Sequence, residues 1–271
     1  MIPALSDGSA LVTGILLCLC LPAFVPWWLP VFGVAFAILV SKHLYGGLGN
    51  NVFNPAMAGY AVLLISFPRE LSLWPADPDV FRTSLADTLA IITQGGLAST
   101  SQWDAITGAT VLDHARTLRI TSGGDPAIYS RLIQDQSMLL NVAFLAGGIW
   151  LWAKHVIGWH IPVALLTCLL VLSTFHSTVT EHGLSPLIHL FSGATMLTAF
   201  FIATDPVSAA TGVYGKLIYA AGIAVIAWTI RSFGGYPDGF AFAVLLMNCT
   251  VPLLDQVEPH WSRQTRRDES E

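Results

Sequence analysis

Residues 186–204 read PLIHLFSGATMLTAFFIAT and contain no Asp, Glu, Lys or Arg. An apolar run of this length is sufficient for a helix to cross the hydrocarbon core of a bilayer. Seven other segments share this character, and the eight are 9–21, 27–42, 53–67, 137–153, 160–174, 186–204, 216–230 and 239–254. The sequence therefore predicts an all-α polytopic membrane protein with about eight transmembrane or re-entrant helices. The first and third segments are short and bounded by Pro and Gly, so we expect broken or re-entrant helices there.

The composition of the 271 residues excludes several classes of protein. Charged residues make up 11% of the chain, against about 25% in a typical soluble domain, while hydrophobic residues make up 54%. Mean hydropathy is +0.64. A soluble enzyme or a disordered chain does not fit, because so few charges cannot cover so much apolar surface. The formal net charge of −5 provides no basic patch for a nucleic acid, so we expect no nucleic-acid partner.

One long polar stretch, 68–136, divides the apolar segments into two groups. We interpret 1–67 as an incomplete first membrane repeat, 137–254 as a second repeat and 255–271 as a polar tail. If the N-terminus is cytoplasmic and each segment crosses once, only Arg231 falls in a short outer loop. The basic residues on the cytoplasmic side are then Lys42, Lys154, Lys216, Arg263, Arg266 and Arg267. This bias supports the orientation, which puts the 68–136 loop in the periplasm of a Gram-negative cell and the tail in the cytoplasm.

The two groups of segments resemble each other in sequence. The matched pairs are 9–22 with 192–206, 43–47 with 231–235, and 54–65 with 236–247. The last pair reads NPAMAGYAVLLI and YPDGFAFAVLLM. In the predicted topology each pair crosses the membrane in opposite directions, which is the signature of an inverted repeat, and chance similarity between apolar runs is the alternative. The second half has five segments and the first has three, so the repeat predicts two helices before Met1 and an N-terminally truncated chain.

The polar loop carries the motif with the clearest chemistry. Residues Asp104 to Thr110 read DAITGAT, which has the form D-x-x-[ST]-G-A-T with Thr107 in its fourth position. The small Gly108 and Ala109 leave the backbone open to another enzyme, which could then reach the Thr110 hydroxyl. This pattern is recognised by the flavin transferase that attaches FMN to threonine through its phosphate, which tethers the cofactor and leaves its ring free to carry electrons. An ordinary loop turn is the alternative.

A second SGAT sequence, Ser192 to Thr195, is a weaker candidate for modification. His189 stands six residues before Thr195, where Thr110 has Asp104. The second sequence also lies in a membrane segment, where a soluble transferase has poor access, and its small residues are typical of close helix packing. We therefore assign the flavin to Thr110.

Two other features carry no assigned role. The run 46–51, GGLGNN, followed by Asn54 and Pro55 indicates a helix break and restart, with Asn54 as N-cap. Its exposed N–H groups suit an anion, the ligand shell of an ion or a flavin edge, and a structural hairpin is the alternative. Asp205 and Asp238 are either ion-path carboxylates or, as we favour, caps at helix ends.

The sequence predicts no catalytic residue of its own and no metal site. No pair of histidines has zinc-ligand spacing, and five of them lie near segment ends, where we expect interfacial anchoring. These are His155, His160, His176, His182 and His189. Tryptophans near segment ends, such as Trp27 and Trp28, fit the aromatic belts of a membrane protein.

At this point the motifs resemble a known family. They are Tyr45–Asn50 (YGGLGN), Phe53–Met57 (FNPAM), Leu63–Pro68 (LLISFP), Ser192–Met196 (SGATM) and Phe233–Pro237 (FGGYP). Together they look like the RnfD family of the Rnf electron-transport complexes, which is related to the NqrB family of the sodium-pumping NADH:quinone oxidoreductases. The resemblance covers the chain up to about Pro252. Val52 and Val111 stand where the family usually has proline, and family members carry further helices before the segment that starts near Ser6.

The resemblance implies a membrane subunit of a redox-driven ion pump in the bacterial inner membrane, with FMN as a phosphoester on Thr110. Its partners would be the membrane, iron–sulfur and flavin subunits of the Rnf complex and, for maturation, the flavin transferase. Electrons would move between NADH and a ferredoxin-type acceptor, coupled to ion movement. We expect the lone chain to be inactive. The ion, the direction of electron flow and the presence of a second, non-covalent flavin stay open.

Two rival interpretations come from other classes of protein. Inverted repeats and broken helices are equally typical of secondary transporters and channels, which have no use for a covalent flavin. The other rival is a non-catalytic scaffold that has lost its role through truncation. Covalent flavin and co-purification with redox subunits separate these alternatives.

Overall fold

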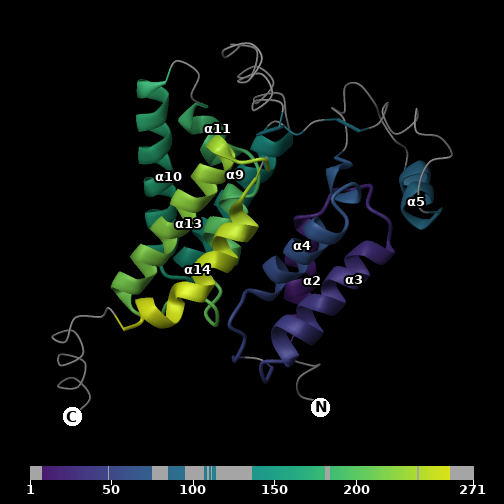
Figure 1. Ribbon diagram of the computed structural model, residues 1–271, viewed down its shortest axis with the longest axis horizontal. Helices are drawn as coiled ribbons and strands as arrows, with labels where there is room; N and C mark the ends of the chain where they lie inside the picture. The colour runs from purple at the N-terminus through teal and green to yellow at the C-terminus, as the bar shows by residue number, and fades with distance from the viewer. Residues whose placement is uncertain are drawn as a thin grey trace. The chain divides into compact units, whose positions relative to one another are not determined.

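The computed structural model describes residues 8–47, 49–74, 85–94, 107–108, 110, 112–113, 136–180, 184–236 and 238–256. The chain forms two compact units, Met1–Gln136 and Ser137–Glu271. The described residues of both units form helices joined by turns, as expected for an all-α membrane protein (Figure 1).

In the first unit, three helical segments pack against one another. They are α2 (Ser9–Leu19), α3 (Trp28–Phe36), which continues as the π-helix η1 (Ala37–His43), and α4 (Pro55–Ser66). The backbones of α3 and α4 approach closely, since a Cβ atom added to Gly59 would lie 2.7 Å from the carbonyl oxygen of Gly33. Small residues at such a crossing bring helices together where no hydrophobic effect drives their association.

The start of α4 follows the sequence prediction. Asn54 is the N-cap, and its side-chain oxygen accepts a hydrogen bond from the Met57 backbone N–H at 3.2 Å. Pro55 occupies the first helical position, where its missing N–H costs nothing. The glycine turn before it has positive φ at Gly46 and Gly47, which explains why glycine stands there.

After α4 the chain forms a short 3₁₀ helix, η2 (Glu70–Ser72), and then α5 (Leu85–Gln94). The sequence analysis treated 68–136 as a polar loop and did not predict α5. Trp27 of the first unit donates its backbone N–H to the Ile92 carbonyl of α5 at 3.2 Å. The described part of the loop is therefore attached to the helices of this unit.

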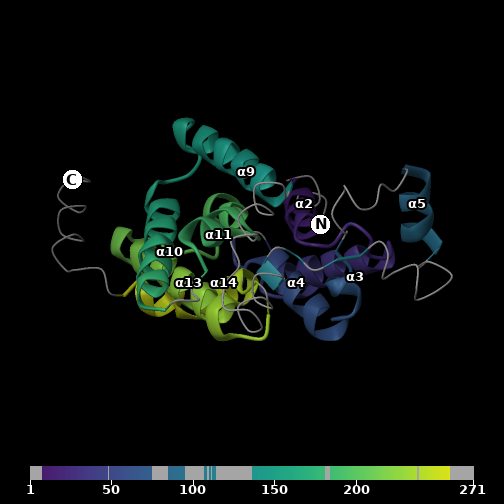
Figure 2. The same ribbon diagram turned by 90° about the horizontal axis from the view of Figure 1, so that it is seen from above.

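The second unit contains α9 (Gln136–Ala153), α10 (His160–Val179), α11 (Pro186–Phe191), α12 (Thr195–Leu197) with the π-helix η3 (Thr198–Ile202), α13 (Val213–Phe233) and α14 (Phe240–Leu254). Helix α13 packs against both α10 and α14. Figure 2 shows α9 to one side of these three helices. Buried side chains at their centre include Leu165, Leu169, Tyr219, Ile223 and Val244.

Each of the eight predicted apolar segments corresponds to helix in the structure. Two of them, His160–Val179 and Val213–Phe233, are long and apolar enough by themselves to cross a membrane, and the other apolar helices are shorter. The first and third segments form short helices, and the structure adds a break that the sequence did not predict. Helices α2 and α4 are continuous over 11 and 12 residues, whereas the sixth segment is interrupted between α11 and α12.

Candidate functional site

The predicted flavin threonine, Thr110, lies in the first unit and is half-buried. Its Oγ1 accepts a hydrogen bond from the Asp113 backbone N–H at 3.3 Å, so the hydroxyl caps a short helical turn. Leu112, inside that turn, is buried and anchors it. This bond uses a lone pair of the hydroxyl oxygen and leaves its hydrogen uninvolved.

The backbone next to Thr110 is attached to the helical part of the unit. Gly108 donates its N–H to the carbonyl oxygen of Trp74 at 3.0 Å, and Trp74 follows α4 and η2 closely in the chain. Thr107 and Gly108 are half-buried, whereas Asp104 and Ala109 lie outside the described residues. The structure therefore places three of the five predicted residues, Thr107, Gly108 and Thr110, together on one anchored segment.

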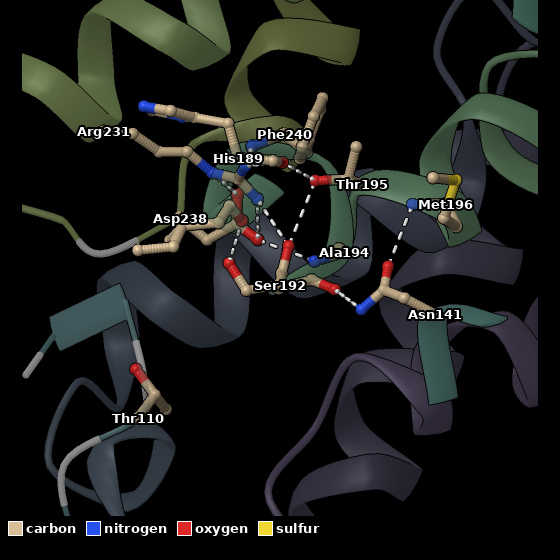
Figure 3. A network of polar contacts seen from close by, with 12 residues as sticks. Thr110, Asn141, His189, Ser192, Ala194, Thr195, Met196, Arg231, Asp238 and Phe240 are labelled. Carbon is tan, nitrogen blue, oxygen red and sulfur yellow. Dashed lines mark hydrogen bonds and ion pairs between the residues drawn. The ribbon is translucent and has the colours of Figure 1, made fainter. Parts of the chain in front are cut away.

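The second SGAT sequence, in the other unit, occupies a very different setting (Figure 3). Ser192, Gly193 and Ala194 form the break between α11 and α12, and Gly193 has a φ of +61°, which favours glycine. Thr195 is fully buried, and its Oγ1 donates to the carbonyl oxygens of His189 at 2.8 Å and Ser192 at 3.1 Å. The hydroxyl hydrogen of Thr195 is thus held inside the break.

An ion pair with a buried arginine closes one side of this break. Arg231 NH2 lies 3.2 Å from Asp238 Oδ2, and the Arg231 side chain is fully buried. The guanidinium also donates to the carbonyls of His189 at 2.8 Å and Ser192 at 3.2 Å, and stands 4.7 Å from the centre of the Phe240 ring. These are the carbonyls that the end of α11 leaves without intrahelical partners, so Arg231 acts as its C-terminal cap.

Asp238 completes the pair by accepting from two backbone groups. Its Oδ2 accepts from Ala194 N–H at 2.9 Å and its Oδ1 from Phe240 N–H at 3.3 Å. The prediction that Asp238 caps a helix end is therefore confirmed at the start of α14. The prediction that Arg231 lies in an outer loop was wrong, because Arg231 belongs to the last turn of α13 and is buried against Asp238.

Asn141 of α9 closes the other side of the break. Its Nδ2 donates to the Gly193 carbonyl at 3.1 Å, and its Oδ1 accepts from Met196 N–H at 3.2 Å. One buried amide thus satisfies a carbonyl before α12 and an N–H within it. The network of Asn141, Arg231 and Asp238 provides the partners that unwound backbone requires inside a membrane protein.

With this geometry established, comparison with known proteins places the chain. The model of the NQR2, RnfD, RnfE family matches residues 1–262. The chain belongs to this family. Among its curated relatives, the D subunit of the ion-translocating oxidoreductase complex of Escherichia fergusonii is 48% identical over 268 residues, covering 93% of this chain and 76% of the relative. The protein of the same name from Pseudomonas aeruginosa is 47% identical over 257 residues, covering 93% and 73%.

A related contact occurs in the first unit of this family member. Lys42, at the end of η1, is buried, and its Nζ donates to the hydroxyl of Ser9, the first residue of α2. In the sequence alignment Ser9 matches Ser192, and Lys42 precedes the residue that matches Arg231 by one position. Lys42 thus contacts the hydroxyl of Ser9 in the first unit, and Arg231 contacts the backbone carbonyl of Ser192, the C-cap of α11, in the second.

The other predicted groups have structural partners. Asp205 accepts from Val207 N–H at 3.3 Å and from the Ser208 hydroxyl at 2.7 Å, so it caps a turn between η3 and α13, where the sequence predicted the cap of a helix end. His189 is fully buried, and its expected interfacial position was therefore wrong. Within the described ranges, no group of three or more His, Cys, Asp or Glu side chains is placed to hold a metal ion.

Proposed function

We propose that this chain is the RnfD-type membrane subunit of an ion-translocating oxidoreductase complex, and that it carries electrons through FMN bound as a phosphoester to Thr110. Membership of the family and the names of its relatives support the first part. The second part rests on the different states of the two candidate hydroxyl groups. We place the complex in the bacterial inner membrane, with its iron–sulfur and flavin subunits as partners and a flavin transferase for maturation.

The Thr110 hydroxyl fits a phosphoester. Esterification removes the hydrogen of the hydroxyl and keeps the oxygen lone pairs, so the bond from Asp113 N–H is compatible with it. Gly108, held by Trp74, carries no side chain that would obstruct the approach to Thr110. Thr195 does not fit, because its hydroxyl is the donor in both of its bonds and no part of the residue is exposed.

The role of the chain's own residues is to hold the attachment point. FMN, when bound, would supply one- or two-electron redox chemistry. The Gly108–Trp74 bond fixes the backbone two residues before Thr110, and the buried Leu112 fixes the turn after it. An attachment point held at both sides restricts the positions from which electrons can be exchanged with partner subunits.

In-gel flavin fluorescence tests the attachment. The chain is expressed with its complex and with flavin transferase, denatured and examined under ultraviolet light. We expect a fluorescent band that Thr110→Val abolishes and that the matched control Thr195→Val retains. A band that stays bright in Thr110→Val, or that is dark in the unmodified chain, contradicts the assignment of FMN to Thr110. A dark band in the unmodified chain also favours the transporter or channel interpretation.

Co-purification tests membership of a complex separately. An affinity tag on this chain is expected to recover iron–sulfur and flavin subunits in both the unmodified chain and Thr110→Val. Thr110→Val removes the hydroxyl that would receive the flavin phosphate. Because Thr110 is outside the network of Asn141, Arg231 and Asp238, we expect this substitution to preserve assembly. Isolation as a lone chain from native membranes would contradict the subunit role.

A further inference from the structure

Helix α5 has an apolar stripe, of which the first unit leaves Leu85 and Leu89 exposed. Leu85, Leu89 and Ile92 follow the spacing i, i+4 and i+7, which places them on one face of a helix. Leu85 is 85% exposed and Leu89 is 60% exposed, while Ile91, which points away from this stripe, is buried. A ten-residue helix of this kind in a polar loop requires an apolar environment for its outer face.

The attachment of α5 gives its level relative to the membrane. The Trp27 N–H bond to the Ile92 carbonyl holds the end of α5 beside the start of α3. Trp27 and Trp28 are exposed, as are Val31 and Phe32 in the first turns of α3. In a membrane protein of this family, exposed tryptophans followed by exposed aliphatic and aromatic residues mark the boundary between headgroups and hydrocarbon.

A small cavity lies where α5 meets this boundary. Its volume is about 220 Å³, and its lining includes Cys18, Leu21, Val25, Trp27, Pro30 and Ile92. Among the described residues, no charged side chain contributes to the lining. The lining is mostly apolar, and a cavity of this kind favours hydrocarbon over ordered water.

We propose that α5 lies in the outer-leaflet interface of the membrane, with Leu85 and Leu89 among the acyl chains and one phospholipid acyl chain in the cavity beside Trp27. Lipid is the occupant that fits, because the stripe and the cavity continue the exposed apolar surface of α3. Interfacial helices bury such a face at the boundary between headgroups and acyl chains. The predicted orientation, with the start of α3 at the outer face, selects the outer leaflet.

This position of α5 would have a consequence for the flavin loop, and that consequence rests on the proposed function. Helix α5 precedes Thr110 in the chain, and the Gly108–Trp74 bond holds the segment immediately before Thr110. Two points of the loop before Thr110 would then be tied to the membrane-embedded part of the unit. The attachment point would remain beside the membrane and would not extend into the periplasm.

Photo-crosslinking in the intact complex tests the position of α5. A benzophenone amino acid replaces Leu89, and a matched control replaces Ala90, which is on a different face of the helix. After irradiation in native membranes, we expect phospholipid adducts at position 89 and markedly fewer at position 90. Adducts to a partner subunit at position 89, or the absence of lipid adducts there, would overturn the proposal.

A second measurement addresses solvent exposure and the cavity. A nitroxide at Leu89→Cys is expected to collide more with oxygen and less with a water-soluble nickel complex than one at Ala90→Cys. Ala23→Trp, which places a large side chain at the cavity lining, is expected to reduce the phospholipid retained by the purified complex. Unchanged retention of phospholipid contradicts the acyl-chain site. Frequent collisions with the nickel complex at position 89 contradict the position of α5 in the membrane interface. In-gel flavin fluorescence of the same samples reports separately on the proposed function.

Discussion

The buried Arg231 and the partly exposed Asp238 form an ion pair, with 3.2 Å between NH2 and Oδ2, that joins the end of α13 to the start of α14. Through the carbonyls of His189 and Ser192 and the N–H of Ala194, the same pair holds the break between α11 and α12. Both charged side chains therefore form hydrogen bonds to backbone groups at the break. The first role of the pair is to satisfy the unwound chain.

We predict that Arg231→Met strongly destabilises the second unit. Removing the buried guanidinium leaves the partly exposed Asp238 without its partner and takes one donor from each of two carbonyls, to which Thr195 Oγ1 also donates, at a cost of about 1–3 kcal/mol. The measurement is the thermal unfolding midpoint of the purified chain in detergent. Arg231→Lys keeps the charge and loses the fork that reaches two carbonyls, so its midpoint is expected between the other two. A midpoint for Arg231→Met equal to that of the unmodified chain contradicts this account.

A second prediction concerns the amide that bridges the break. Asn141→Leu keeps the approximate size of the side chain and loses both hydrogen bonds, to Gly193 and Met196, so we expect a loss of about 1–3 kcal/mol. The same thermal unfolding measurement applies. Asn141→Asp retains an acceptor for Met196 N–H but places a buried carboxylate against the Gly193 carbonyl, so we expect it to lose stability as well. Equal unfolding midpoints for the unmodified chain, Asn141→Leu and Asn141→Asp would show that the Asn141 bridge contributes nothing to stability.

The N-cap of α4 gives a third prediction. Asn54→Ala removes the acceptor for Met57 N–H and should cost about 1 kcal/mol, whereas Asn54→Asp keeps an acceptor in the same place. The free energy of unfolding in denaturant, measured for both variants, checks the difference. Equal losses for Ala and Asp would show that the cap bond contributes nothing.

The crossing of α3 and α4 gives a fourth prediction. Gly59→Ala puts a methyl group 2.7 Å from the Gly33 carbonyl oxygen, which is backbone and cannot turn aside. We expect a loss of about 1–3 kcal/mol from the forced separation of the helices. Gly14→Ala in α2 is the matched control, because its nearest contact is the Val34 side chain at 3.9 Å. Tolerance of both substitutions in the unfolding assay would contradict the close crossing.

The sequence predicted those features of the fold that depend on local composition. Apolar length alone located the eight segments, and Asn54 followed by Pro55 predicted the start of α4 because capping involves neighbours in the chain. Helix α5 was missed because the search was for long apolar runs, and ten amphipathic residues within a polar stretch do not form one. Local patterns are therefore informative here only for long or capped elements.

The features that depend on distant residues could not be predicted in this way. Hydropathy treats Arg231 as a loop residue, since it takes no account of Asp238 and of the carbonyls that receive the guanidinium. The break at Gly193 is held by Asn141, far away in the sequence, and small residues such as Ser192 and Ala194 are equally compatible with a continuous helix. The available signal was the glycine itself, which suits the positive φ observed there.

Localised mass analysis of the natively expressed chain tests the central claim most directly. The account predicts an intact mass increased by one FMN phosphoester, with the modification on the peptide that contains Thr110 and none on the peptide that contains Thr195. An unmodified mass from cells that contain the flavin transferase, or a flavin located on Thr195, would contradict the assignment of Thr110 as the electron-carrying site.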